Sequence, residues 1–206
     1  GVYSEEQNGE VFPIVLPDNV HLIGEERENT ILTANADEDN QAAVMIIPEC
    51  MNVKVSNMTL KNGYSESHGC SGGGALLVTS NDTKDLSWEM ETNLAVVENL
   101  IIENSYSHNG GGLSIYRVDG PTVSNLIVRN NSATMHGGGI FVYSSNVAME
   151  DVEIYGNSCI GTYYGNYNDM GHGGGLMMNQ TWGTYDNMNI HNNTAAMNGG
   201  GVWSSM

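Results

Sequence analysis

The stretch SATMHGGGIFVYS (residues 132–144) places three consecutive glycines directly before a run that alternates like a β-strand. Glycine normally weakens a strand, because it costs conformational entropy and packs no side chain. The 206-residue chain nevertheless repeats this run five times, starting at Gly72, Gly110, Gly137, Gly173 and Gly199. The spacings of 38, 27, 36 and 26 residues indicate a repeat with a base period near 26 and two insertions.

A second motif repeats in step with the glycines. It has an apolar residue, a polar residue, Asn or Asp, and then a short alternating strand that ends in Asn or Gly. The copies are VSNMTLKNG (55–63), VENLIIENS (97–105), VSNLIVRNN (123–131), MEDVEIYGN (149–157) and YDNMNIHNN (185–193). The segment PDNVHLIGE (17–25) is predicted to be an earlier copy.

Each period therefore contains at least two short strands separated by Asn and Gly corners. Such a unit cannot bury its own apolar face, but stacked copies can, with parallel strands ~4.8 Å apart. A sandwich of hairpins would instead need two-residue turns at irregular positions. The sequence predicts a single all-β domain over residues 1–206, a β-solenoid of six to seven turns with insertions at 82–93 and 157–172.

The glycine repeats resemble those of a known superfamily. The segments GGAL (73–76), GGLS (111–114), GGIF (138–141), GGLM (174–177) and GGVW (200–203) are similar to repeats of right-handed parallel β-helices of the pectate-lyase-like superfamily. They also resemble the Gly-Gly-apolar repeats of chlamydial polymorphic outer membrane proteins. The Phe that opens the Phe-x-x-Asn motif of those proteins is replaced here by Ile101, Ile127 or a similar residue. Residues 1–32 resemble the first turns of bacterial surface β-helix proteins. The resemblance implies a right-handed parallel β-helix in an extracellular or cell-surface protein.

Composition limits the partners. The chain has 24 acidic and 6 basic residues, a formal net charge of −18, which argues against nucleic acid and anionic membranes. No apolar run approaches the roughly 20 residues of a membrane span, so insertion of this segment is not expected. The chain opens on Gly1 without a signal-peptide pattern, and we expect a fragment of a longer surface or secreted protein.

Stacking turns residue positions into columns with predictable chemistry. The third motif position predicts an asparagine ladder, because each amide can both donate and accept along the stack. Its predicted members are Asn19, Asn57, Asn99, Asn125, Asp151 and Asn187. Gly137, Gly138 and Gly139 are predicted to be structural, at a tight corner. The residues between the inward positions of the second motif are predicted to form a solvated, stabilising column on the outside of the stack. Its members are Lys61, Glu103, Arg129, Tyr155 and His191, and the first three alternate in charge.

Four aromatic residues after the glycines are predicted to face solvent and to form a ligand-binding surface: Tyr116, Phe141, Tyr143 and Trp203. Exposed aromatic patches mark binding surfaces, and sugar rings stack on such platforms. The alternative is that the two insertions fold over this face. The expected partner is a glycan or a surface protein, with end-to-end self-association of copies as a further possibility.

A catalytic site is the competing hypothesis. His136 and His172 precede glycine runs on successive turns, and the second insertion adds Tyr167 and Asp169. Two imidazoles with a carboxylate could bind a metal, and His with Tyr could act as acid and base. The alternative is that these are solvated corner residues.

The resemblance suggests a polysaccharide lyase or glycoside hydrolase. The chain has only six Lys and Arg side chains, however, to neutralise the carboxylates of a uronate substrate. Calcium could compensate through the oxygen ligands of 37–40, 81–85 and 166–169, which lack the spacing of an EF-hand. A shared fold is not by itself evidence for a particular activity. The sequence therefore favours a non-catalytic, adhesin-like, structural or glycan-binding module, with a polysaccharide-active enzyme as the alternative.

Overall fold

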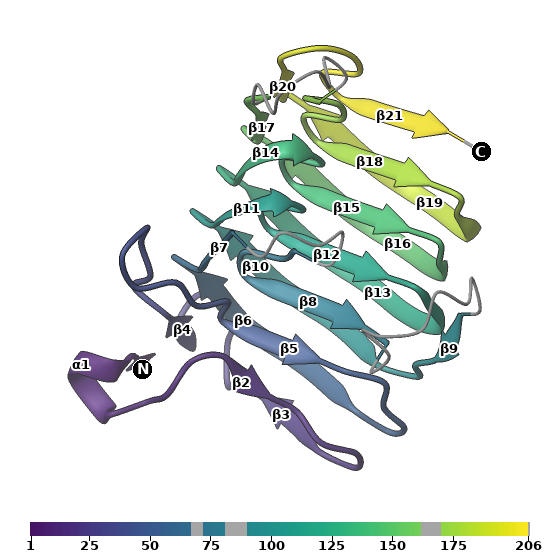
Figure 1. Ribbon diagram of the computed structural model, residues 1–206. Coiled ribbons are helices and arrows are strands. Elements are labelled where there is room, and N and C mark those ends of the chain that lie inside the picture. Colours follow the sequence, from purple (N-terminus) through teal and green to yellow (C-terminus); the bar gives the residue numbers. More distant parts are fainter. Residues whose placement is uncertain (67–71, 81–89, 162–169, 206) are drawn as a thin grey trace.

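The computed structural model describes residues 1–66, 72–80, 90–161 and 170–205. The chain winds into three parallel sheets that run side by side along the stack (Figure 1). One of them has seven strands, one from each turn, so the predicted parallel β-helix and its number of turns are confirmed. A short helix, α1 (Glu5–Asn8), lies near the N-terminus.

The strands pair in parallel with strands of the neighbouring turns. Sheet A runs in the order β1 (Val2–Tyr3), β4 (Ile31–Thr33), β6 (Lys54–Lys61), β10 (Val96–Glu103), β13 (Val118–Arg129), β16 (Asn146–Tyr155) and β19 (Trp182–His191). Sheet B contains β2 (Ile14–Val15), β5 (Met45–Ile47), β8 (Leu76–Thr79), β12 (Leu113–Tyr116), β15 (Ile140–Tyr143), β18 (Leu176–Asn179) and β21 (Val202–Ser205). Sheet C contains β7 (Tyr64–Ser65), β11 (Tyr106–Asn109), β14 (Ser132–His136), β17 (Ser158–Cys159) and β20 (Thr194–Ala195).

The core follows the period-2 alternation of the strands. Leu100 of β10 lies opposite Met58 of β6, and Leu126 of β13 lies opposite Val152 of β16, all buried. On the outer face of sheet A the predicted charged column is present. Arg129 forms an ion pair with Glu103 at 2.7 Å and donates a hydrogen bond to the Tyr155 hydroxyl at 3.1 Å. The side of sheet A that faces away from the core is therefore stabilised by polar contacts between turns.

The predicted asparagine ladder is present at a bend in sheet A. Its members all adopt the left-handed backbone conformation, with φ between 47° and 59°, which Asn and Asp tolerate better than most residues. Asn99 donates to the Asn57 side chain at 2.7 Å, and Asn125 donates to Asn99 at 3.0 Å. Asn187 donates to Asp151 in the same way.

The first turn departs from this ladder. Two separate strands, β3 (His21–Ile23) and β4, share the length of β6, so the early copy is broken by a loop. The Gly24 N–H donates to the Ser56 carbonyl, which places this glycine beside Asn57. Asn19 instead accepts a hydrogen bond from Asn52 at 3.1 Å. The prediction that Asn19 belongs to the ladder was therefore wrong, because the pairing register differs from that of the later copies.

A second, buried asparagine ladder was not predicted. Asn131, Asn157 and Asn193 follow the motif and turn their amides toward the strand ends of sheet A. Asn157 accepts from the Asn131 backbone at 2.9 Å and side chain at 3.1 Å, and donates to Asn193 at 3.0 Å. The doublets that end the motif, such as Asn130–Asn131 and Asn192–Asn193, were the available signal. The first residue of each doublet makes the left-handed turn and the second forms the ladder.

The glycine runs form the corner between sheets C and B. Gly137 has φ 63°, and a Cβ on Gly138 would lie 2.4 Å from the Gly174 carbonyl oxygen of the next turn. Both features require glycine at this corner. In the first run the register is shifted by one, so that Leu76 pairs with Leu113.

The two predicted insertions are only partly described. In the first, β9 (Glu91–Thr92) adds to sheet A beside Val118 and Asp119, while 82–89 lie outside the described residues. The second begins later than position 157, because Ser158 and Cys159 still pair with β14. The chain rejoins the repeat at His172, which pairs with His136, and 162–169 lie outside the described residues. A search of the described part of the chain for helices long and apolar enough to cross a membrane found none.

Candidate functional site

Sheet B differs from sheet A in charge, and the strands of sheet C also lack Asp, Glu, Lys and Arg. Its seven strands contain no Asp, Glu, Lys, Arg or His, although the chain has 24 acidic residues. The strands of sheet A, by contrast, carry acidic residues from β10 to β19. The outward positions of sheet B are instead hydroxyl, amide, aliphatic and aromatic groups. This charge-free face is suited to a neutral ligand.

Aromatic rings follow this face from turn to turn. We call them the aromatic column, which consists of Tyr116, Tyr143, Phe141, His136, His172 and Trp203. The Tyr116 and Tyr143 rings lie opposite each other on β12 and β15 and stack with centroids 5.3 Å apart. Successive contacts continue the column through Phe141 and His136, at 6.0 and 6.2 Å between centroids. Tyr116 and Tyr143 meet face to face because parallel strands repeat about every 4.8 Å, whereas Phe141 and His136 extend the contact within the turn of Tyr143.

The column ends at the corner beside the last glycine runs. His136 and His172 form a parallel bridge, and their rings stack at 5.7 Å with an interplanar angle of 10°. Trp203 of β21 stacks on His172 at 4.8 Å. The structure thus brings together both predicted catalytic histidines and all four predicted ligand-binding aromatics.

The exposure of these side chains differs from what the alternation predicted. Phe141 is only 2% exposed, while Tyr116, Tyr143 and Trp203 are half-buried. The prediction that Phe141 faces solvent was wrong. Its ring is flanked along the chain by His136 and Tyr143, and Ser114 and Met177 occupy the same position on the neighbouring strands. The accessible part of the column therefore lies at the two tyrosines and Trp203.

The imidazole of His136 is held in its neutral form. Burial, and secondarily the neighbouring His172, lower the pKa of His136 to about 4. Its Nδ1 atom is buried and has no hydrogen-bond partner among the described residues. His172 Nδ1 lies 3.3 Å from the Asn198 amide. A general base works best with a pKa near the working pH, so His136 is a poor base at neutrality.

This pKa shift predicts a measurable pH dependence. An unfolded histidine has a pKa near 6.5, so between pH 6.5 and 4 the unfolded chain binds the proton and the folded chain does not. The contribution of His136 to stability is therefore complete above pH 6.5 and is lost as the pH falls. We expect His136→Asn to remove this loss, since Asn109 and Asn198 occupy equivalent corners.

The measurement is urea unfolding of both proteins at pH 7 and pH 4. Between pH 7 and pH 4 the wild type should lose about 2 kcal/mol or more of unfolding free energy that the variant does not lose. A wild-type-to-variant difference that does not change with pH would show that His136 titrates normally.

The other parts of the catalytic hypothesis remain predictions. Tyr167 and Asp169 lie outside the described residues. Of the three stretches predicted to offer calcium ligands, only 37–40 is described. There the Asp37 carboxylate accepts hydrogen bonds from the backbone of Asp39 and Asn40 at 3.1 and 2.9 Å. No cluster of three or more His, Cys, Asp or Glu side chains that could hold a metal ion occurs among the described residues.

A polar cluster on sheet C was missed by the sequence interpretation. Tyr64 and Tyr106 stack at 4.4 Å, and the Tyr64 hydroxyl donates to Glu66 at 2.8 Å. Burial and the hydrogen bond to Glu66 raise the pKa of Tyr64. The Glu66 N–H in turn donates to the Gln41 side chain at 3.1 Å, which fixes the loop before β5 against sheet C. The signal was the recurrence of Tyr at one repeat position.

Cys50 and Cys159 are free and buried, and burial raises their pKa values to about 11 and about 12.

Comparisons with known proteins identified no relative of the chain. No protein-family model, no curated protein and no solved structure matches the chain.

Proposed function

We propose that the protein is a non-catalytic, extracellular or cell-surface β-solenoid that binds a neutral glycan on sheet B. The observation that carries the proposal is the absence of charge from all seven strands of this sheet in so acidic a protein. The net charge of −18 would repel a polyuronate, whereas a neutral sugar meets no such penalty. Within the proposal, the chain is a member of the pectate-lyase-like superfamily of right-handed β-helices.

The accessible part of the aromatic column supplies the contact. Tyr116 and Tyr143 are half-buried and lie side by side on a flat parallel sheet. The C–H face of a pyranose packs on such rings, and nearby hydroxyl and amide groups can bond to sugar hydroxyls. Asn179 and Ser205 continue the tyrosine position along the stack and offer these groups. A polysaccharide chain could therefore lie along the solenoid axis.

The test replaces the tyrosines with residues that the chain itself uses at that position. Tyr116→Thr copies Thr79, and Tyr143→Asn copies Asn179, so both should fold. We expect the double variant to bind neutral polysaccharides about tenfold more weakly, because two ring contacts are lost. Affinity electrophoresis in gels containing glucan, galactomannan or polygalacturonate measures this.

A control variant addresses the loss of tyrosine itself. Tyr155→His removes a tyrosine from the charged face and copies His191, and it should leave binding unchanged. Equal retardation of the wild type and the double variant would contradict the proposed face. Stronger retardation by polygalacturonate than by the neutral polymers would contradict the proposed ligand class.

A further inference from the structure

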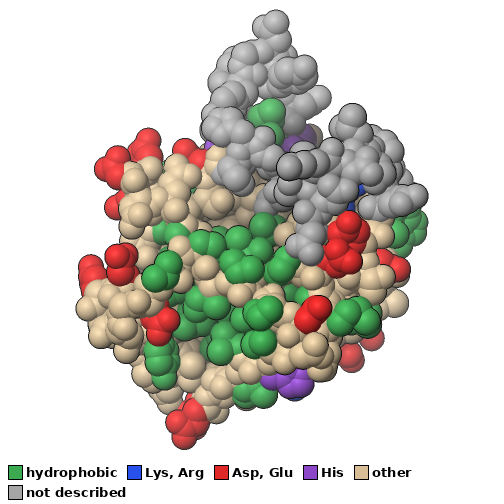
Figure 2. Space-filling model, turned by 60° about the horizontal axis from the view of Figure 1, so that its bottom comes forward, with side chains coloured by type: hydrophobic (Ala, Val, Ile, Leu, Met, Phe, Trp, Pro, Cys, Tyr) green, Lys and Arg blue, Asp and Glu red, His purple; other side chains and the backbone are tan. Residues whose placement is uncertain are grey.

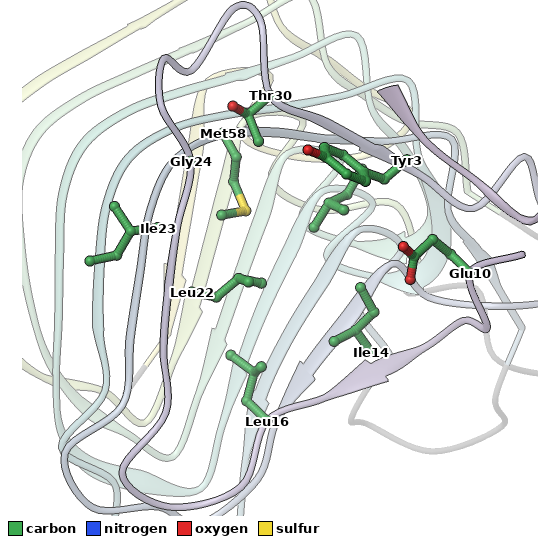
Figure 3. Close-up of a pocket in the computed structure, with 10 residues that line it drawn as sticks. Tyr3, Glu10, Ile14, Leu16, Leu22, Ile23, Gly24, Thr30 and Met58 are labelled. Carbon is green, nitrogen blue, oxygen red and sulfur yellow. The ribbon is translucent and has the colours of Figure 1, made fainter. Parts of the chain in front are cut away.

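The N-terminal end of the solenoid contains an open cavity of about 450 Å³. Its walls come from the first strands of sheets A and B, and Leu16, Leu22 and Met58 form its apolar interior (Figure 3). Leu16 and Met58 are 4% and 1% exposed, whereas Ile23 at the rim is 55% exposed. The cavity is large enough for one or two aliphatic side chains. Glu10 and Tyr3 lie at its edge (Figure 3).

A free strand edge borders this cavity. In the described part of the chain, β2 pairs with β5 and with no other strand. The N–H groups of Ile14 and Leu16 donate to Val44 and Ile46 across that pair, both at 3.0 Å. Because backbone directions alternate along a strand, the N–H and C=O of Val15 point to the open side. The residue Val15 is 54% exposed, so this position of the edge is open to solvent.

The surroundings of the cavity are strongly acidic. Residues 5–28 contain one basic residue, Arg27, whose guanidinium is paired with Glu28 at 2.9 Å. The acidic residues of the same segment are Glu5, Glu6, Glu10, Asp18, Glu25, Glu26 and Glu28. Figure 2 shows hydrophobic side chains gathered at the centre of this end with acidic groups around them. An occupant should therefore combine apolar side chains with positive charge.

We propose that this end binds an extended peptide that is both apolar and basic. The peptide adds a parallel or antiparallel strand to the free edge of β2 and places an aliphatic side chain between Leu16 and Leu22. A Lys or Arg beside that residue lies near the Glu10 carboxylate. Main-chain hydrogen bonds then supply affinity, while the cavity and the acidic rim supply specificity. The proposal is independent of the glycan-binding face on sheet B.

A second copy of the chain is the other occupant whose shape would fit. Its C-terminal end exposes Val202, Trp182 and Met197 and repeats the same three-sheet cross-section. That end brings no complementary charge, because residues 130–206 contain no Lys or Arg. The charge distribution therefore favours a basic peptide over end-to-end stacking.

The experiment is a fluorescence anisotropy titration of the 206-residue chain with labelled hexapeptides. The probe is acetyl-KVTIVK-amide, with EVTIVE and KSTSSK as charge and apolarity controls. We expect the basic apolar peptide to bind at least about tenfold more tightly than either control and to weaken as salt rises. Equal binding of all three peptides, or no binding of KVTIVK at millimolar protein, would overturn the proposal.

Three variants locate the site. Val15→Pro removes the outward N–H without touching the bonds to β5 and should weaken binding about tenfold, whereas Val15→Thr keeps the N–H and should not. Glu10→Gln should reduce both the affinity for the peptide and its salt dependence. If the proline variant folds poorly, this second variant tests whether the peptide binds at the proposed site. Full binding by Val15→Pro and Glu10→Gln would overturn the site. Sedimentation velocity that shows end-to-end association of the wild type would identify a second copy as the occupant and overturn the peptide.

Discussion

Gly138→Ala is expected to lower the free energy of unfolding by about 4 kcal/mol or more. The added Cβ would lie 2.4 Å from the Gly174 carbonyl oxygen and 2.5 Å from the Ser158 carbonyl carbon. Both contacts are with backbone, which cannot move without breaking the ladder between turns. Urea unfolding followed by circular dichroism measures the loss.

Gly200→Ala is the matched control, because Gly200 occupies the same repeat position in the last turn. The nearest atom to an added Cβ there is the Asn193 carbonyl oxygen at 3.3 Å. We expect a change of about 1 kcal/mol or less in this variant. Equal destabilisation by the two substitutions would show that close stacking of the turns is not the reason for the glycines.

Asn157→Ala is the second large effect, with an expected loss of about 4 kcal/mol in unfolding free energy. The buried side chain accepts two hydrogen bonds from Asn131 and donates to the carbonyls of Val128 and Tyr155 and to Asn193. Truncation leaves several of these groups buried without a partner, which costs more than the lost bonds themselves. Thermal and urea unfolding should agree on the loss.

Asn125→Gly provides the contrast on the outer ladder. Asn125 is exposed and has φ 51°, so glycine relieves backbone strain while one exposed hydrogen bond to Asn99 is lost. The two effects offset each other, and we expect a change within about 1 kcal/mol. If Asn125→Gly proves as damaging as Asn157→Ala, the inner ladder has no special role.

The sequence predicted the repeat and its corners well because those positions tolerate few residues. Gly138 has no room for a side chain, and the ladder corners need a left-handed backbone that Asn readily adopts. The inner ladder at Asn157 was missed because the outer and inner asparagines follow one another within the same motif. The first turn was misaligned because a loop between β3 and β4 divides the strand, which leaves no mark in the apolar alternation.

The residues of the candidate site were predicted from the sequence, but their exposure to solvent was not. Alternation correctly placed Tyr116, Tyr143 and Trp203 on one outward face, and stacking placed His136 beside His172. It could not show that Phe141 is buried, because this depends on how closely His136, Tyr143 and the neighbouring strands pack around the ring. The charge-free character of sheet B became visible only when the strands were assigned to sheets, since these residues are scattered along the chain.

The most direct test of a binding solenoid is to follow a bound polysaccharide over time. The protein is incubated with a neutral glucan or galactomannan that retards it in gels, and light scattering records the molar mass of the polymer. We expect the polymer to elute together with the protein and to keep its molar mass over many hours. A falling molar mass would show cleavage and contradict a non-catalytic role, and separate elution with every neutral polymer would contradict glycan binding.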